Sequence, residues 1–187
     1  MKALDTTYKG FRFRSRLEAR WAVFMDTLGV RFEYEREAYE LDGLCYLPDF
    51  WLPDNGFHLE IKPQNPNLEE EEKAYRLAYH TKLPVFILVG QPECPDIERN
   101  WYQTESQALL YLTLEKGQRG FDTHHLWVED CAKCKRFGFS FDGRWISSCG
   151  CNPITSCERY AFATPSLVSA YAKARGYRFE PNGENFP

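Results

Sequence analysis

The feature that most constrains this fold is a turn between two short apolar segments. Residues 45–53 read CYLPDFWLP, the tetrapeptide PDNG occupies 53–56, and FHLEIK follows at 57–62. Asn-Gly readily supplies the positive φ angles of a tight turn, so the two segments are predicted to pair as a β-hairpin. Side chains alternate between the two faces of such strands, and one face is expected to be buried.

A helix is predicted before this hairpin, from about Arg16 to Leu28. Ser15 stands three residues before Glu18, which is the spacing of a capping box. Apolar residues then recur at helical intervals, and Gly29 follows as a stop signal. The alternating residues 30–41 are predicted to form a strand between the helix and the hairpin.

A helix and a buried strand are predicted after the hairpin. Residues 68–82 have a helical pattern with acids in the first turns, where the helix dipole favours them. The run LPVFILVG at 83–90 is continuously apolar, as expected of a strand covered on both faces. The order helix, three strands, helix, strand predicts an α/β core with a mixed sheet flanked by helices.

The rest of the chain is divided at a predicted connector, KGQRG at 116–120. Residues 1–120 are interpreted as the main domain and 121–187 as a smaller module. Residues 96–115 fit a helix or a strand equally well. The last predicted helix begins at Thr164 and Pro165, and we expect it to pack on the module that precedes it.

Length and composition limit the class of protein. The chain has 187 residues, enough for one full domain and a small appendage. It contains no apolar run of the ~20 residues that a membrane span needs, and its first residues do not read as a secretory signal. We therefore expect a cytoplasmic protein with reduced thiols and no membrane partner.

Charge is distributed unevenly along the chain, although the net charge is only −4. Residues 1–36 carry 8 basic and 5 acidic side chains, and residues 131–187 carry 8 and 4. Residues 37–99 carry 5 basic and 13 acidic side chains. Basic ends suit a polyphosphate partner and an acidic middle suits a divalent cation, although ordinary solvated surfaces would also explain both.

The predicted hairpin brings two acids and a lysine together. Glu60 and Lys62 are two residues apart on one strand and leave the same face, and Asp49 lies on the preceding strand. Two carboxylates and a main-chain carbonyl are hard oxygen ligands suited to Mg²⁺, and Lys62 could orient an attacking water. Each residue taken singly also has a structural explanation. Glu60 and Lys62 could lie on a solvated face, and Asp49 could be an acid at a strand edge. Glu18 in the preceding helix could serve only as a cap.

The combination of Pro48-Asp49 with Glu60-Ile61-Lys62 resembles the PD-(D/E)XK nuclease superfamily, which has a restriction-endonuclease-like fold. The resemblance covers residues 8–90, and residues 8–35 look like the first helix of phage and prophage members. It implies that Asp49 and Glu60 bind Mg²⁺ or Mn²⁺, that Ile61 adds its carbonyl, and that Lys62 is the catalytic lysine. Glu18 would be the helix acid facing the metal. Lys62 is followed by Pro63, where many relatives carry a small residue.

Cysteines near the C-terminus have the spacing of a structural zinc site. A C-x-x-C pair, a hairpin-like stretch and a C-x-C pair resemble a zinc ribbon, and the predicted ligands are Cys131, Cys134, Cys149 and Cys151. Cys157 is the rival for the fourth position, and His124 or His125 also stays open as a ligand. A redox role for the C-x-x-C pair is the competing interpretation.

These features lead to the expectation of a metal-dependent DNA nuclease, related to phage DNA processing or repair, with a structural zinc ribbon. The alternative is a catalytically silent protein of the same fold that binds nucleic acid or a host protein. The sequence shows no clear dimer surface, so a homodimer and a host or phage protein partner both stay open.

Overall fold

The computed structural model describes residues 5–95, 108–114, 117–131, 136–141 and 163–179. Three helices lie within these ranges: α1 (Arg16–Thr27), α2 (Leu68–Thr81) and α3 (Pro165–Gly176). Four short strands precede the β-hairpin: β1 (Thr6–Tyr8), β2 (Phe11–Phe13), β3 (Glu33–Tyr34) and β4 (Tyr39–Glu40). The hairpin region and the C-terminal half supply the others: β5 (Cys45–Tyr46), β6 (Phe50–Leu52), β7 (Phe57–Lys62), β8 (Val85–Val89), β9 (Ala108–Thr113), β10 (Arg119–Cys131) and β11 (Arg136–Phe141).

The main sheet within the described residues has seven strands in the order β11-β10-β9-β8-β7-β6-β3. Only β7 and β8 pair in parallel, and α2 connects them, while the other neighbours are antiparallel. Two small ladders, β1-β2 and β4-β5, stand outside this sheet. The predicted α/β class with a mixed sheet is therefore confirmed.

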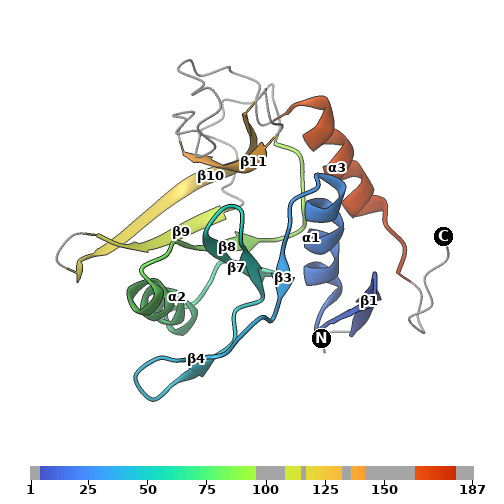
Figure 1. Ribbon diagram of the computed structural model, residues 1–187. Helices are drawn as coiled ribbons and strands as arrows, with labels where there is room; N and C mark the ends of the chain where they lie inside the picture. The colour runs from blue at the N-terminus through green and yellow to red at the C-terminus, as the bar shows by residue number, and fades with distance from the viewer. Residues whose placement is uncertain (1–4, 96–107, 115–116, 132–135, 142–162, 180–187) are drawn as a thin grey trace.

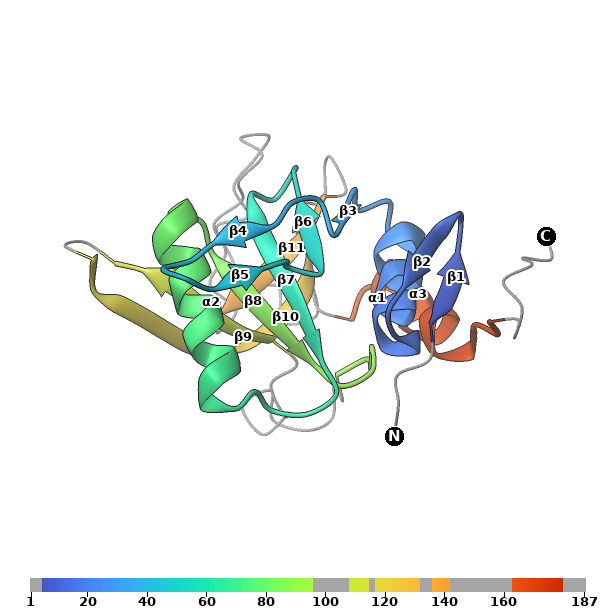
Figure 2. The same ribbon diagram turned by 90° about the horizontal axis from the view of Figure 1, so that it is seen from below.

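Helices cover both faces of the sheet, as predicted. On one face, α1 and α3 pack over Phe57, Leu59 and Ile61 of β7. On the other face, α2 packs over Val85 and Ile87 of β8, together with apolar residues of the β4-β5 hairpin. Figures 1 and 2 show α2 on one side of the sheet and α1 with α3 on the other. Since side chains alternate along β7, His58, Glu60 and Lys62 face the α2 side.

The predicted turn and the three predicted helices form as expected. Gly56 adopts a φ of 75°, and its amide donates to the carbonyl of Leu52 at 2.8 Å, which closes the β6-β7 hairpin. The side chain of Ser15 caps α1 by accepting from the amide of Glu18 at 3.2 Å. Asn67 and Glu70 form a capping box at the start of α2.

Two predicted strands are interrupted instead of continuous. The segment 30–41 forms β3 and β4, because Glu35 adopts a φ of 46° and turns the backbone between them. The segment 45–53 forms β5 and β6 on either side of Pro48, which has no amide hydrogen for a ladder. The ambiguous segment before residue 115 contains β9, whose pairing with both β8 and β10 selects the strand.

The sheet continues across residue 120, where the sequence suggested a domain boundary. That position lies inside β10, which pairs with β9 and β11. The C-terminal helix packs on α1: Arg20 donates to the carbonyl of Ala174 at 2.7 Å, and the rings of Phe24 and Tyr171 are 4.5 Å apart. It also packs against β10, which lies largely in the predicted module, and Trp127 and Phe137 share its apolar cluster. The expected packing on the rest of the ribbon stays a prediction, because residues 132–135 and 142–162 lie outside the described residues.

Candidate functional site

The register of β6 and β7 places Asp49 and Glu60 opposite each other. Phe50 pairs with Leu59, and Asp49 is the next residue outward from Phe50. The amide of Asp49 donates to Oε2 of Glu60 at 3.3 Å. The two acids predicted from the sequence to lie side by side are thus brought together by the hairpin, 11 positions apart in the chain.

The Asp49 carboxylate is buried, with 6% of its surface exposed. Its Oδ2 accepts a hydrogen bond from the amide of Ile61 at 2.8 Å. Burial raises the pKa of Asp49 well above its usual range, and the negative charges of Glu60 and Glu18 raise it further. The Ile61 amide and the Lys62 ammonium act in the opposite direction but do not compensate. Burial and the neighbouring acids thus both disfavour the charged form of Asp49.

Glu60 is equally buried, and two side-chain donors contact it in addition to the Asp49 amide. Its Oε1 accepts from Nζ of Lys62 at 3.1 Å, and its side chain is hydrogen-bonded to the hydroxyl of Tyr46. Burial raises the pKa of Tyr46 well above its usual value, and the charge of Glu60 adds to this effect. Tyr46 thus acts as a neutral donor to the carboxylate. Sequence reasoning missed Tyr46, because its only signal was an aromatic residue in the strand before the hairpin.

Lys62 lies between two carboxylates. Its Nζ is 3.1 Å from Glu60 and 3.5 Å from Oε1 of Glu70, which also closes the capping box of α2. Burial lowers the pKa of Lys62, but the charges of Glu60, Asp49 and Glu70 outweigh it and the net shift is upward. Lys62 is therefore an ammonium at neutral pH and can orient an anion or a water, not accept a proton.

Glu18 is buried at the start of α1, and both of its oxygens are used locally. Oε2 accepts from the amide of Arg14 at 3.1 Å and from the hydroxyl of Tyr34 at 2.7 Å, while Oε1 accepts from the Ser15 hydroxyl at 2.6 Å. Glu18 thus accepts a hydrogen bond from the amide of Arg14, whereas in a capping box it would accept from the amide of Ser15. The charge of Glu18 nevertheless acts on Asp49.

The residues fit a hard divalent cation by the chemistry of their donors. Among the described residues, no three Asp, Glu, His or Cys side chains converge on one point that could hold a metal. Mg²⁺ is commonly bound by only one or two protein carboxylates, with waters and substrate phosphate completing its shell. Asp49 and Glu60 supply such a pair, and a cation would offset the negative charge that Lys62 leaves uncompensated.

The other predicted functional residues are placed only in part. Cys131 is the last residue of β10, whereas Cys134, Cys149, Cys151 and the rival Cys157 lie outside the described residues. Cys45 is exposed and Cys94 half-buried, and neither forms a disulfide in the part of the chain that is described. The predicted zinc site stays a prediction.

The arginines around Glu18 divide into different roles. Arg20 donates to the carbonyls of Ala174 and Arg175 near the end of α3. Arg14 forms an ion pair with Glu35, and Arg16 is exposed. Arg14 and Arg16 are both exposed, whereas Arg20 is half-buried.

No protein-family profile, curated protein or solved structure matches the chain. Within the described ranges, the longest helix is too short and too polar to cross a lipid bilayer.

Proposed function

We propose that this chain is a metal-dependent nuclease that hydrolyses phosphodiester bonds in DNA, with the Asp49, Glu60 and Lys62 cluster as its active site. The observation that carries the proposal is the pairing of two buried carboxylates across one hairpin with an ammonium 3.1 Å from Glu60. A purely structural role explains this poorly, because burying two acids beside each other costs free energy that one lysine does not recover. The sequence resemblance to the PD-(D/E)XK superfamily agrees with this assignment.

In this proposal, Asp49, Glu60 and the carbonyl of Ile61 hold Mg²⁺ or Mn²⁺. A bound ion of this kind supplies an activated water and neutralises charge on the phosphate. The hydrogen bond from the Ile61 amide holds Oδ2 of Asp49 in place. The other oxygen of the carboxylate is then the one that would bind the metal. Lys62 orients the water or the phosphate, and Glu70 keeps the ammonium in place.

In this proposal, a restriction-endonuclease-like core carries the site. The C-terminal cysteines form a zinc ribbon that holds structural Zn²⁺ and contacts DNA. Phage-related DNA processing or repair in the cytoplasm is the biological setting that the resemblance implies. A homodimer and a host or phage protein partner are compatible with this proposal.

Cleavage of labelled linear, branched and single-stranded DNA in Mg²⁺ or Mn²⁺ tests the proposal. We expect metal-dependent cutting by the wild type and none by Asp49→Asn or Glu60→Gln, whose volumes are nearly unchanged. Glu69→Gln is the matched control, because Glu69 is an exposed acid in the first turn of α2 and pairs only with Lys73 among described side chains. Absence of cutting on every substrate, or cutting that survives both site variants, would contradict the proposal.

A second candidate is a nucleic-acid-binding protein that does not cut. It is favoured by the local use of the carboxylates: Glu18 is committed to the cap of α1, and no group of three metal ligands forms in the described part of the chain. Calorimetric titration with Mn²⁺ separates the two functions. Binding that requires Asp49 supports the nuclease, whereas DNA binding without any metal binding supports the silent protein.

A further inference from the structure

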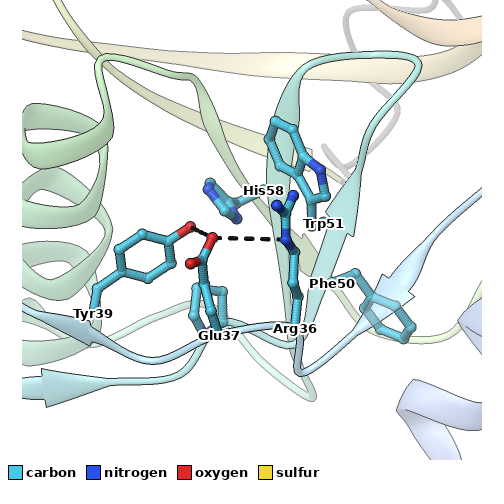
Figure 3. A pocket seen from close by; sticks show the side chains of 7 residues that line it. Arg36, Glu37, Tyr39, Phe50, Trp51 and His58 are labelled. Carbon is cyan, nitrogen blue, oxygen red and sulfur yellow. Dashed lines mark hydrogen bonds and ion pairs between the residues drawn. The ribbon is translucent and has the colours of Figure 1, made fainter.

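A narrow recess lies beside the carboxylate cluster on the same face of the sheet. Its walls include Trp51 of β6, His58 of β7 and Tyr39 of β4, and two residues between β3 and β4, Arg36 and Glu37 (Figure 3). The side chains pack so closely that no water-sized cavity lies between them in this structure. A ligand therefore has to displace the exposed Arg36 side chain to enter.

Aromatic rings form its walls. The rings of Trp51 and His58 are 4.7 Å apart, and those of Tyr39 and His58 are 5.5 Å apart and nearly perpendicular. The Arg36 guanidinium lies 5.8 Å from the centre of the Trp51 ring. Rings and guanidinium planes of this kind stack on nucleobases. Because Arg36 already holds the cation position over Trp51, a cationic ligand is disfavoured.

His58 is the feature that points to a ligand. Only 3% of its surface is exposed, and neither ring nitrogen has a hydrogen-bond partner among the described residues. Leaving a buried donor or acceptor unsatisfied costs about 1–3 kcal/mol. An uncharged imidazole ring offers one donor and one acceptor. The polar edge of a nucleobase presents both complementary groups.

The recess lies close to the proposed active site along both strands. His58 precedes Glu60 by two residues, and Trp51 follows Asp49 by two residues. Two residues of a strand span about 6.6 Å, which is about the spacing of neighbouring nucleotides in an extended single strand. A base near the scissile phosphate could therefore reach the recess, provided that the base is unpaired and unstacked.

We propose that this recess binds an unpaired nucleobase of the strand whose phosphate lies at Asp49 and Glu60, so that the chain prefers single-stranded or distorted nucleic acid over intact duplex. This inference deepens the proposed nuclease function and rests on it for the position of the phosphate. Base binding itself needs no cleavage and is measured separately.

Binding of short single strands in EDTA, followed by fluorescence anisotropy, tests the inference. Each strand is compared with a fully abasic strand of the same length, which keeps the phosphates and removes the bases. We expect Trp51→Ala to weaken binding of the normal strand by about 5- to 150-fold, the usual worth of one stacked base, and to leave the abasic strand unaffected. Trp51→Phe, which keeps a stacking ring, should retain most of the affinity.

Arg36→Ala provides a second variant at an exposed position, in case Trp51→Ala does not fold. We expect it to weaken binding of the normal strand about 2- to 5-fold and to spare the abasic strand. Tyr79→Ala removes an exposed aromatic ring of α2 and should leave binding unchanged. Equal losses on DNA and RNA assign the recess to bases of both, whereas a loss on DNA alone assigns it to DNA.

The inference is overturned if the variants weaken normal and abasic strands equally, or if neither strand loses affinity. Intact duplex that binds as well as the single strand also overturns it. Base-dependent binding without metal-dependent cutting would contradict the nuclease proposal and support base binding in the recess. Metal-dependent cutting without base-dependent binding would support the nuclease proposal and contradict base binding in the recess.

Discussion

The amide of Ile61 donates a hydrogen bond to Oδ2 of Asp49 across the β6-β7 hairpin, with a length of 2.8 Å. Ile61 itself points its side chain to the α1 face, while its backbone orients a carboxylate for the opposite face. One residue thus contributes to the core and to the candidate site. The same contact orients the Asp49 carboxylate, although burial and the neighbouring acids disfavour its charge.

Asp49→Asn is expected to stabilise the fold at neutral pH. The pKa of Asp49 is raised in the folded protein, so its ionisation opposes folding as the pH rises above the ordinary range of an aspartate. Asparagine keeps an oxygen to accept from Ile61 and removes the charge. Urea unfolding at pH 7 should show a gain on the order of 1 kcal/mol, as is common when a strained functional site is neutralised. A loss of stability would show that the carboxylate charge is compensated.

Lys62→Met is expected to abolish cutting while it increases affinity for Mn²⁺. The ammonium of Lys62 competes with a metal for Glu60, from which it is 3.1 Å away. Calorimetry should detect tighter Mn²⁺ binding than in the wild type. Lys73→Met, which removes a lysine paired with Glu69 on α2, is the control and should change neither property. Unchanged cutting by the Lys62 variant would exclude Lys62 from the proposed active site.

His58 should make stability depend on pH. Its pKa is lowered by burial to about 4, against about 6.5 in an unfolded chain, so the unfolded state takes up the proton first as the pH falls. Its contribution is present above pH ~6.5 and is lost toward pH ~4, to a total of up to about 3 kcal/mol. His58→Phe should flatten this slope in denaturant titrations between those pH values. His80→Gln, at an exposed histidine of α2, should keep the wild-type profile.

Arg20→Ala is expected to destabilise the contact between α1 and α3. The guanidinium donates to carbonyls at the end of α3, and hydrogen bonds to a charged group contribute about 1.5–3 kcal/mol. Thermal unfolding should show a loss of that order, without a change in Mn²⁺ affinity. The exposed neighbour Arg16→Ala should stay within about 0.5 kcal/mol of the wild type. A mild effect at Arg20 would mean that apolar packing alone holds α3.

Removal of zinc tests the C-terminal cysteines. Elemental analysis of the purified chain should find one equivalent of zinc, and Cys131→Ser or Cys149→Ser should lose it. Cys45→Ser, an exposed cysteine in β5, should retain it. If zinc is retained after substitution of Cys149 but lost after substitution of Cys157, Cys157 is the ligand in place of Cys149. A chain that contains no zinc would contradict the predicted zinc ribbon.

Much of the local structure could be predicted from the sequence. The cap at Ser15, the turn at Gly56 and the strand that carries Glu60 and Lys62 all formed where the pattern placed them. These features depend on residues close in the chain: a capping side chain, a glycine at positive φ, and the alternation of a strand. The nearness of Asp49 to Glu60 followed from the same hairpin.

Tertiary structure alone decided what surrounds that pair. Three contacts of this kind join segments that the sequence pattern does not predict to be neighbours. They are the hydrogen bond of Tyr46 to Glu60, the effect of Glu18 on Asp49, and the burial of His58 against Tyr39. The choice of a strand at β9 and the docking of α3 on α1 likewise depended on partners far away in the chain. The sequence by itself determined which residues share a face of one hairpin, because that follows from backbone geometry. Packing of distant elements determined their burial and charge environment, because both depend on everything within a few ångströms of a side chain.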